Sequence, residues 1–185
     1  MRRFGDCGNQ ATSRQHERPS ADAHGFAPVR GMPGGKLNGS LSREMPSKSE
    51  DEIIREILQS ARVVAVVGLS HKIWRPSNRV SGYMQSEGYR IIPVNPKERE
   101  VFGEKAYASL EDIPEKIDLV NVFRRSEFVP PLVEAAIRVG AKAFWMQEEV
   151  VHEEAAEQAR AAGLLVVMDR CIMQEHIRWK RETAS

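Results

Sequence analysis

A glycine and a serine follow the predicted strand over residues 62–67, in the segment Gly68-Leu69-Ser70. A glycine after a strand lets backbone N–H groups approach a phosphate, and the positive end of a following helix adds to the attraction. The same loop and the start of the next helical pattern supply more hydroxyl groups and positive charges, at Ser70, His71, Lys72, Arg75, Ser77 and Arg79. Such a collection suits a pyrophosphate. The simpler alternative is a plain turn with solvated charges at Lys72 and Arg79, because the segment lacks a G-x-G-x-x-G motif.

A second group, Asn95-Pro96-Lys97, follows the predicted strand over residues 89–94. In dinucleotide-binding folds this place holds Asp or Glu, whose carboxylate binds the ribose hydroxyl groups. A carboxylate repels a phosphate, whereas the Asn95 amide does not, and Lys97 can neutralise one. The pattern therefore argues against NAD and favours a nucleotide with an extra phosphate near its ribose, of which coenzyme A and NADP are the common examples. The alternative is an ordinary Asn-Pro turn.

An aromatic ring and two guanidinium groups, Phe123-Arg124-Arg125, stand where the predicted strand over residues 118–123 gives way to a helix. Paired arginines in a loop are usually solvated. Here they leave a strand beside the other two groups, so an adenine or a phosphate can rest on at least one of them.

The elements that must position these groups alternate regularly along the chain. A capping box at Ser49 and Glu52 opens a first helix, and Pro130 and Pro131 fall in the first turn of another, where proline is tolerated. Expected strands cover residues 62–67, 89–94, 118–123, 143–146 and 164–168, and expected helices cover residues 77–87, 126–140, 153–162 and 172–179, with a loop around Gly103 and a helical turn at 109–112.

The strands read as continuous apolar runs, which is typical of a parallel sheet covered by helices on both faces. The sequence therefore predicts an α/β fold: a Rossmann-like, doubly wound, five-stranded parallel sheet in three layers, with strand order 3-2-1-4-5. In such sheets a ligand binds at the carboxyl ends of the strands, where the order reverses beside strand one.

Composition separates the chain of 185 residues into two parts. Residues 1–48 carry eight Lys and Arg against four Asp and Glu, with seven of the 13 glycines, which predicts a disordered tail before one domain at 49–182. The remaining residues carry 19 basic and 22 acidic groups, so nucleic-acid binding has no electrostatic basis there. Two cysteines without a metal-binding spacing, no long apolar run and no secretory signal predict a cytoplasmic protein that does not enter a membrane.

Five motifs in order resemble the small stand-alone CoA-binding proteins of bacteria, which are similar to the CoA-binding domain in the alpha subunit of succinyl-CoA synthetase. The motifs are Val67-Gly-Leu-Ser70, Arg75-Pro-Ser77, Ile92-Pro-Val-Asn-Pro96, Val122-Phe-Arg-Arg125 and Met168-Asp-Arg-Cys171, and the resemblance covers about residues 50 to 180. It implies that coenzyme A is the ligand, with its phosphates at Gly68, Leu69 and Ser70. It further implies a ribose 3′-phosphate near Asn95, Pro96 and Lys97, an adenosine between Phe123 and Arg124, and a pantetheine arm near Gln147.

The sequence departs from the synthetase in having no ligase domain or phosphohistidine loop after this region, so a CoA-binding protein without catalysis of its own is expected. Glu148 and Glu149 stand where family members commonly have small or neutral residues. The alternatives are an NADP-dependent oxidoreductase, an acyl-CoA synthetase component that needs a partner, and an interaction module of flavodoxin-like shape. The first of these normally needs a second domain, for which no residues remain. A homodimer or a partner enzyme stays open.

Other reactive residues support no separate chemistry. Cys171, beside Arg170, is either a reactive thiol that pairs with CoA or, more simply, a buried structural cysteine. His71, His152 and His176 show no partners at the spacing of a catalytic triad.

Overall fold

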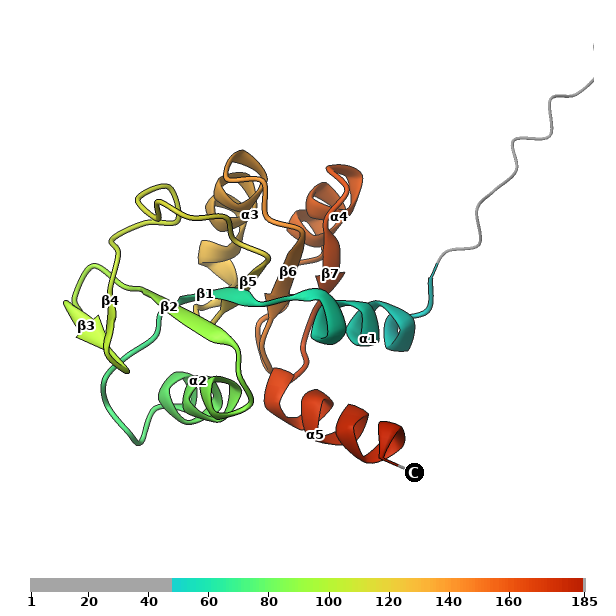
Figure 1. Ribbon diagram of the computed structural model, residues 1–185. Helices are drawn as coiled ribbons and strands as arrows, with labels where there is room; N and C mark the ends of the chain where they lie inside the picture. Colours follow the sequence, from blue (N-terminus) through green and yellow to red (C-terminus); the bar gives the residue numbers. More distant parts are fainter. Residues whose placement is uncertain (1–47, 185) are drawn as a thin grey trace, which may run out of the picture. The chain divides into compact units, whose positions relative to one another are not determined.

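The computed structural model describes residues 48–184, and the tail predicted over residues 1–48 lies outside them except for Lys48. The helices are α1 (Glu50–Ser60), α2 (Pro76–Ser86), α3 (Val129–Arg138), α4 (Glu153–Ala161) and α5 (Ile172–Thr183), with a 3₁₀ turn, η1 (Ser126–Phe128), before α3. The strands are β1 (Val63–Val67), β2 (Arg90–Val94), β3 (Glu100–Val101), β4 (Glu104–Lys105), β5 (Leu119–Val122), β6 (Ala143–Met146) and β7 (Leu165–Val167). The predicted alternation of five long strands with helices is confirmed (Figure 1).

The main sheet is parallel throughout and has the order β2-β1-β5-β6-β7. The Rossmann-like, doubly wound fold is confirmed, and the order reverses beside β1 as expected. The third long strand, β5, pairs with β1, and the place beyond β2 is held by a single parallel bridge between Val94 and Tyr107. In the 3-2-1-4-5 pattern the third strand lies beyond β2; here that place holds only the bridge at Tyr107, and the strand expected over residues 118–123 lies beside β1.

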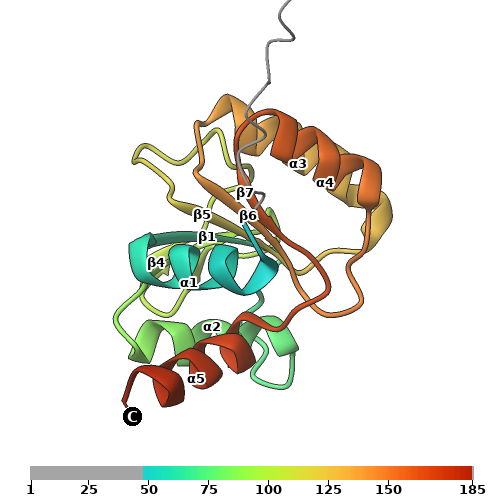
Figure 2. The same ribbon diagram turned by 90° about the vertical axis from the view of Figure 1, so that its right-hand side faces the viewer.

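Each face of the sheet is covered by its own helices. Alternate side chains of β1 point to opposite faces, so Ala65 and Val67 pack with α3 and α4, whereas Val64 and Val66 pack with α1, α2 and α5. Figure 2 shows the same three layers from the side. The buried strand residues are apolar on both faces, as the sequence predicted, except for Asn121 in β5.

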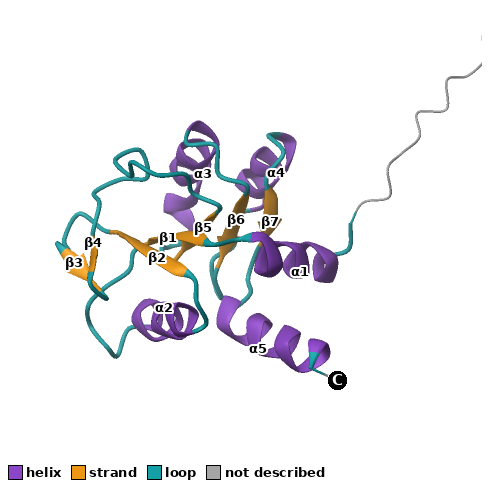
Figure 3. Cartoon of the chain, viewed as in Figure 1, coloured by secondary structure: helices purple, strands orange, loops and turns teal. Residues whose placement is uncertain are grey.

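The connection from β2 to β5 is the one region that differs from the expectation. A loop was expected around Gly103, but residues 100–105 form an antiparallel two-stranded ribbon, β3 and β4 (Figure 3). Its turn residues Phe102 and Gly103 both have positive φ, the pattern of a type I′ turn. Phenylalanine is unusual there, and its ring lies 3.4 Å from the position of a Cβ on Gly82 in α2, so packing rather than turn preference holds it.

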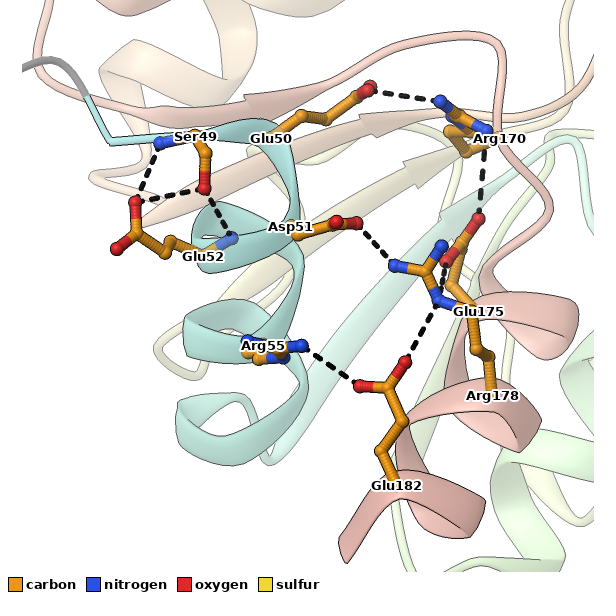
Figure 4. Close-up of polar contacts among 9 residues, drawn as sticks. All are labelled: Ser49, Glu50, Asp51, Glu52, Arg55, Arg170, Glu175, Arg178 and Glu182. Atoms are coloured by element: carbon orange, nitrogen blue, oxygen red, sulfur yellow. Dashed lines mark hydrogen bonds and ion pairs between the residues drawn. The ribbon is translucent and has the colours of Figure 1, made fainter.

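Helix α1 begins with the predicted capping box, in which Ser49 and Glu52 bond each other's backbone N–H groups. It is fixed to α5 by charged side chains as well as by its buried apolar face. Arg178 pairs with Asp51 and with Glu175 and Glu182 of its own helix, and Arg55 reaches Glu182 at 3.0 Å (Figure 4). The first helix is therefore part of the domain rather than a loose leader.

Two classes of feature are not found in residues 48–184. No helix there is long and apolar enough to cross a membrane. The same residues contain no group of three His, Cys, Asp or Glu side chains placed to hold a metal ion.

Candidate functional site

The carboxyl ends of all five long strands lie level along one edge of the sheet. Val67 pairs with Val94 on one side and Val122 on the other, Val122 pairs with Met146, and Trp145 pairs with Val167. The residues that follow therefore stand along this edge in the order Asn95, Gly68, Phe123, Gln147 and Asp169. Four strand spacings of about 4.8 Å make this row roughly 19 Å long, which suits an extended ligand.

Gly68 brings the first loop against the end of β5. Its φ of +87° lies in the left-handed region, and a Cβ built on it would lie 2.6 Å from the carbonyl oxygen of Phe123. Any side chain at this position would push the first loop away from β5. Glycine is thus required at position 68 because the ends of β1 and β5 approach each other closely there.

The Asn95 side chain joins two loops. Its amide nitrogen donates to the carbonyl oxygen of Leu69 at 2.8 Å, and its amide oxygen accepts from the Lys97 backbone N–H at 3.1 Å. We expected this amide to face a ribose, and the structure shows that both of its polar atoms already have protein partners. The Leu69 side chain is fully buried in the core, so only the backbone of this residue is left to contact a ligand.

The start of α2 presents positive charge. Arg75 is its N-cap without a side-chain hydrogen bond, Pro76 opens the helix, and no acidic residue lies in the first turn. Asn78, largely buried in that turn, donates to the carbonyl oxygen of Ser70 at 2.8 Å and fixes the loop to the helix. The positive end of the helix dipole is therefore uncompensated and faces the carboxyl edge of the sheet.

Two adjoining hollows follow this edge. The larger, of about 840 Å³, is lined by six of the residues predicted from the sequence: Arg75, Ser77, Phe123, Arg124, Arg125 and Gln147. The smaller, of about 340 Å³, is lined by four: Gly68, Asn95, Pro96 and Arg124. Arg124 lines both, with its guanidinium 5.5 Å from the centre of the Phe128 ring. The predicted groups are thus brought together, except that Leu69, Ser70 and Lys97 line neither hollow.

Several further residues line the hollows; Glu148, Glu149 and Cys171 were noted from the sequence without an assigned binding role, and the others were missed. The larger hollow also contains Glu148, Glu149, Asp169, Cys171 and Gln174, and the smaller contains Glu111, Phe128, Pro131, Leu132 and Arg138. The rule that loops after parallel strands share one edge would have found the first set, because these residues follow β6 and β7. The second set comes from the turn before β5 and from α3, which carry no local signal. Cys171 is 7% exposed, as a buried cysteine would be.

Gln147 is held in place rather than free. It is buried, and its amide nitrogen donates to the Asn121 side-chain oxygen at 2.8 Å. On the other side of the site His71 makes a similar tie, with its Nδ1 2.8 Å from Glu98 Oε2. Burial raises the pKa of the Glu98 carboxyl, but the hydrogen bonds from His71 outweigh it, so that this pKa lies below its ordinary value. Glu98 is therefore a carboxylate at neutral pH.

The match to known proteins lies in this same region. Residues 62–177 match the family described as CoA binding domain. The curated "Uncharacterized protein YneT" of Bacillus subtilis (strain 168) is 48% identical over 131 residues, which are 71% of this chain and 95% of that protein. A solved structure described as "hypothetical protein from Pyrococcus horikoshii OT3" has a TM-score of 0.67 at 45% identity, over 69% of this chain and 90% of that one.

A more distant likeness is to ADP-forming acetate–CoA ligase I of Archaeoglobus fulgidus, which is 28% identical over 121 residues. These residues are 60% of this chain and 18% of the ligase. The predicted resemblance to stand-alone CoA-binding proteins, with a relation to the corresponding domain of acyl-CoA ligases, is thus confirmed. The fold, the order of the site residues along the sheet edge and the family match agree, and the chain belongs to the CoA binding domain family.

Proposed function

We propose that this protein binds coenzyme A, free or acylated, along the carboxyl edge of the sheet and does not itself catalyse a reaction. The observation that carries the proposal is the pair of adjoining hollows joined at Arg124, one ending at Asn95 and the other reaching past Gln147. An adenosine with phosphates followed by a long pantetheine arm needs such a continuous, uneven groove.

The placement follows from charge and shape. The adenosine occupies the smaller hollow, where Pro96 and Phe128 supply apolar surface. Arg124 lies over the Phe128 ring at the same place. The pyrophosphate lies at the first loop and the start of α2, where Arg75 and the helix dipole supply positive charge. The pantetheine arm runs over Phe123 toward Gln147; Phe123 was expected beside the adenosine, but it lines the larger hollow and not the smaller one.

Lys97 and Ser70 line neither hollow, but each has a binding role in this proposal. Lys97 follows the Asn95 turn, so its ammonium reaches the 3′-phosphate at the rim. Ser70 offers its hydroxyl to the pyrophosphate beside the backbone of Gly68 and Leu69. Asn95 acts by holding the two loops together, and Ser77 and Arg125 line the phosphate side of the larger hollow.

A binding role fits the chemistry of the lining. No histidine lines the larger hollow among the described residues, and its cysteine is largely buried. The carboxylates that also line it, Glu148, Glu149 and Asp169, are exposed to solvent, whereas a general acid or base is commonly tuned by burial beside the reacting atom. The Archaeoglobus fulgidus relative is, by its name, a ligase that uses CoA, which supports CoA over NADP as the ligand.

Isothermal titration of the purified full chain with CoA, dephospho-CoA, NADP and NAD tests the proposal. Binding of CoA with no binding of NAD supports it. Heat with NADP alone would favour the oxidoreductase alternative, and heat with none of the four would favour an interaction module; either result contradicts the proposal.

A further inference from the structure

The far end of the larger hollow carries three carboxylates that the proposed function does not use. Glu148 and Glu149 follow β6, and Asp169 follows β7, and all three line the hollow. All three are exposed to solvent. The opposite part of the hollow is lined by the guanidinium groups of Arg75, Arg79, Arg124 and Arg125. The hollow is therefore positive near β1 and β5 and negative near β6 and β7.

The acidic end is built from fixed backbone. Glu149 and Asp169 have φ values of +67° and +58°, a conformation that costs energy in residues other than glycine. They are joined directly, since the Glu149 backbone N–H donates to Asp169 Oδ1 at 2.8 Å. Trp145 Nε1 donates to the Arg170 carbonyl oxygen at 2.6 Å, which anchors the second loop to β6. These carboxylates are thus held beside the hollow.

The neighbouring Arg170 does not neutralise these three carboxylates. Arg170 follows Asp169 directly, but its guanidinium turns to α1 and α5, with Glu50 at 3.1 Å and Glu175 at 3.9 Å (Figure 4). In the part of the chain that the structure describes, the ion pairs leave Glu148, Glu149 and Asp169 without a cationic partner. The polar neighbour of Glu148 is the neutral amide of Gln174, at 3.5 Å.

We infer that this acidic end selects the acyl group: the protein accepts free CoA and CoA carrying an uncharged short acyl group, and rejects acyl-CoA that ends in a carboxylate. The inference rests on the proposed function. With the adenosine at the end of β2 and the pyrophosphate at β1, the sulfur end of an extended CoA reaches the ends of β6 and β7. A terminal carboxylate there meets three like charges, which disfavours it by mutual repulsion.

Two ligands of nearly equal size separate charge from shape. Butyryl-CoA and succinyl-CoA have acyl chains of the same length, with a methyl group in one where the other has a carboxylate. Titration of the full chain should give similar affinities for CoA and butyryl-CoA, and roughly tenfold weaker binding of succinyl-CoA. Raising the salt concentration should narrow this gap, because the charges are exposed.

The double variant Glu148→Gln with Glu149→Gln should bring the affinity for succinyl-CoA close to that for butyryl-CoA, so the ratio of these two affinities is the readout. Asp169 is kept because it accepts the Glu149 backbone hydrogen bond. The matched control, Glu134→Gln with Glu157→Gln, removes two exposed carboxylates from α3 and α4 outside the hollow and should leave the gap as it is.

The outcomes distinguish the inference from the proposal beneath it. Equal binding of butyryl-CoA and succinyl-CoA, or a gap insensitive to salt and to the double variant, would overturn the inference while CoA binding still stands. Weak binding of both acyl ligands beside tight CoA binding would overturn it too, because the barrier would then be steric. Absence of CoA binding itself would overturn the proposed function and this inference together.

Discussion

At the scale of single residues, the proposed recognition of the 3′-phosphate depends on Lys97, whose backbone N–H donates to the Asn95 side chain. We predict that Lys97→Glu weakens CoA binding by roughly tenfold or more, because it replaces an attractive charge near the 3′-phosphate with a repulsive one. Dephospho-CoA lacks that phosphate and should lose far less. Titration with both ligands measures the difference, and Lys116→Glu, an exposed charge reversal away from both hollows, is the control. Equal loss for the two ligands would show that Lys97 does not meet the 3′-phosphate.

Gly68 supplies a second test at this scale. Gly68→Ala places a Cβ 2.6 Å from the Phe123 carbonyl oxygen, so the first loop must move away from β5 and CoA affinity should fall at least several-fold. Gly163→Ala is a matched control, because Gly163 has a similar φ of +90° but nothing within 4 Å of the added Cβ. Both variants should lose stability from backbone strain, and only Gly68→Ala should also lose CoA affinity. A control that lost as much affinity would show that strain alone explains the effect.

At the scale of elements, helix α5 is attached to α2 and to Tyr89, just before β2, through a buried histidine. His176 is 3% exposed, its Nδ1 lies 2.9 Å from the Tyr83 hydroxyl, and the rings of Tyr83, Tyr89 and Trp179 surround it. Burial lowers the pKa of His176; Glu87 raises it and Lys180 lowers it by smaller amounts. The folded protein therefore holds this imidazole neutral at a pH where the unfolded chain would take up a proton.

The sign of the pH effect follows. Between about pH 7 and pH 5 the unfolded chain binds more protons at this position than the folded one, so stability falls as the pH falls. Urea denaturation at the two pH values should show this loss, and His176→Gln should reduce it. The carboxyls of Glu98 and Asp118, whose pKa values lie below their ordinary ones, lose their stabilising effect only at more acidic pH. A wild-type stability that does not change over this range would contradict the assignment.

At the scale of the whole molecule, the sequence predicted the alternation of elements and the edge that carries the site, because both follow from apolar runs and from the geometry of parallel sheets. It did not predict the β3–β4 ribbon or the single bridge at Tyr107, because each is only one or two residues long. It also missed the internal bonds of Asn95, since a side chain that joins two loops has the same sequence as one that faces a ligand. The local sequence pattern determines the helices, the strands and the edge of the sheet that carries the site. The hydrogen-bond partner of each polar atom depends instead on contacts between segments that are distant in the sequence.

Because the proposed ligand touches loops from β2 to β6, its binding should stabilise the folded domain as a unit. A ligand that binds only the folded state at about 100 times its Kd adds about 2.7 kcal/mol to the free energy of unfolding. For a domain of this size we expect CoA to raise Tm by roughly 5 to 10 °C. The measurement is a thermal melt with CoA and, as the control, with NAD at equal concentration. An equal rise in Tm with NAD would mean that the sheet edge recognises only adenosine and pyrophosphate. Asn95 and Lys97 would then confer no preference for the phosphorylated ribose.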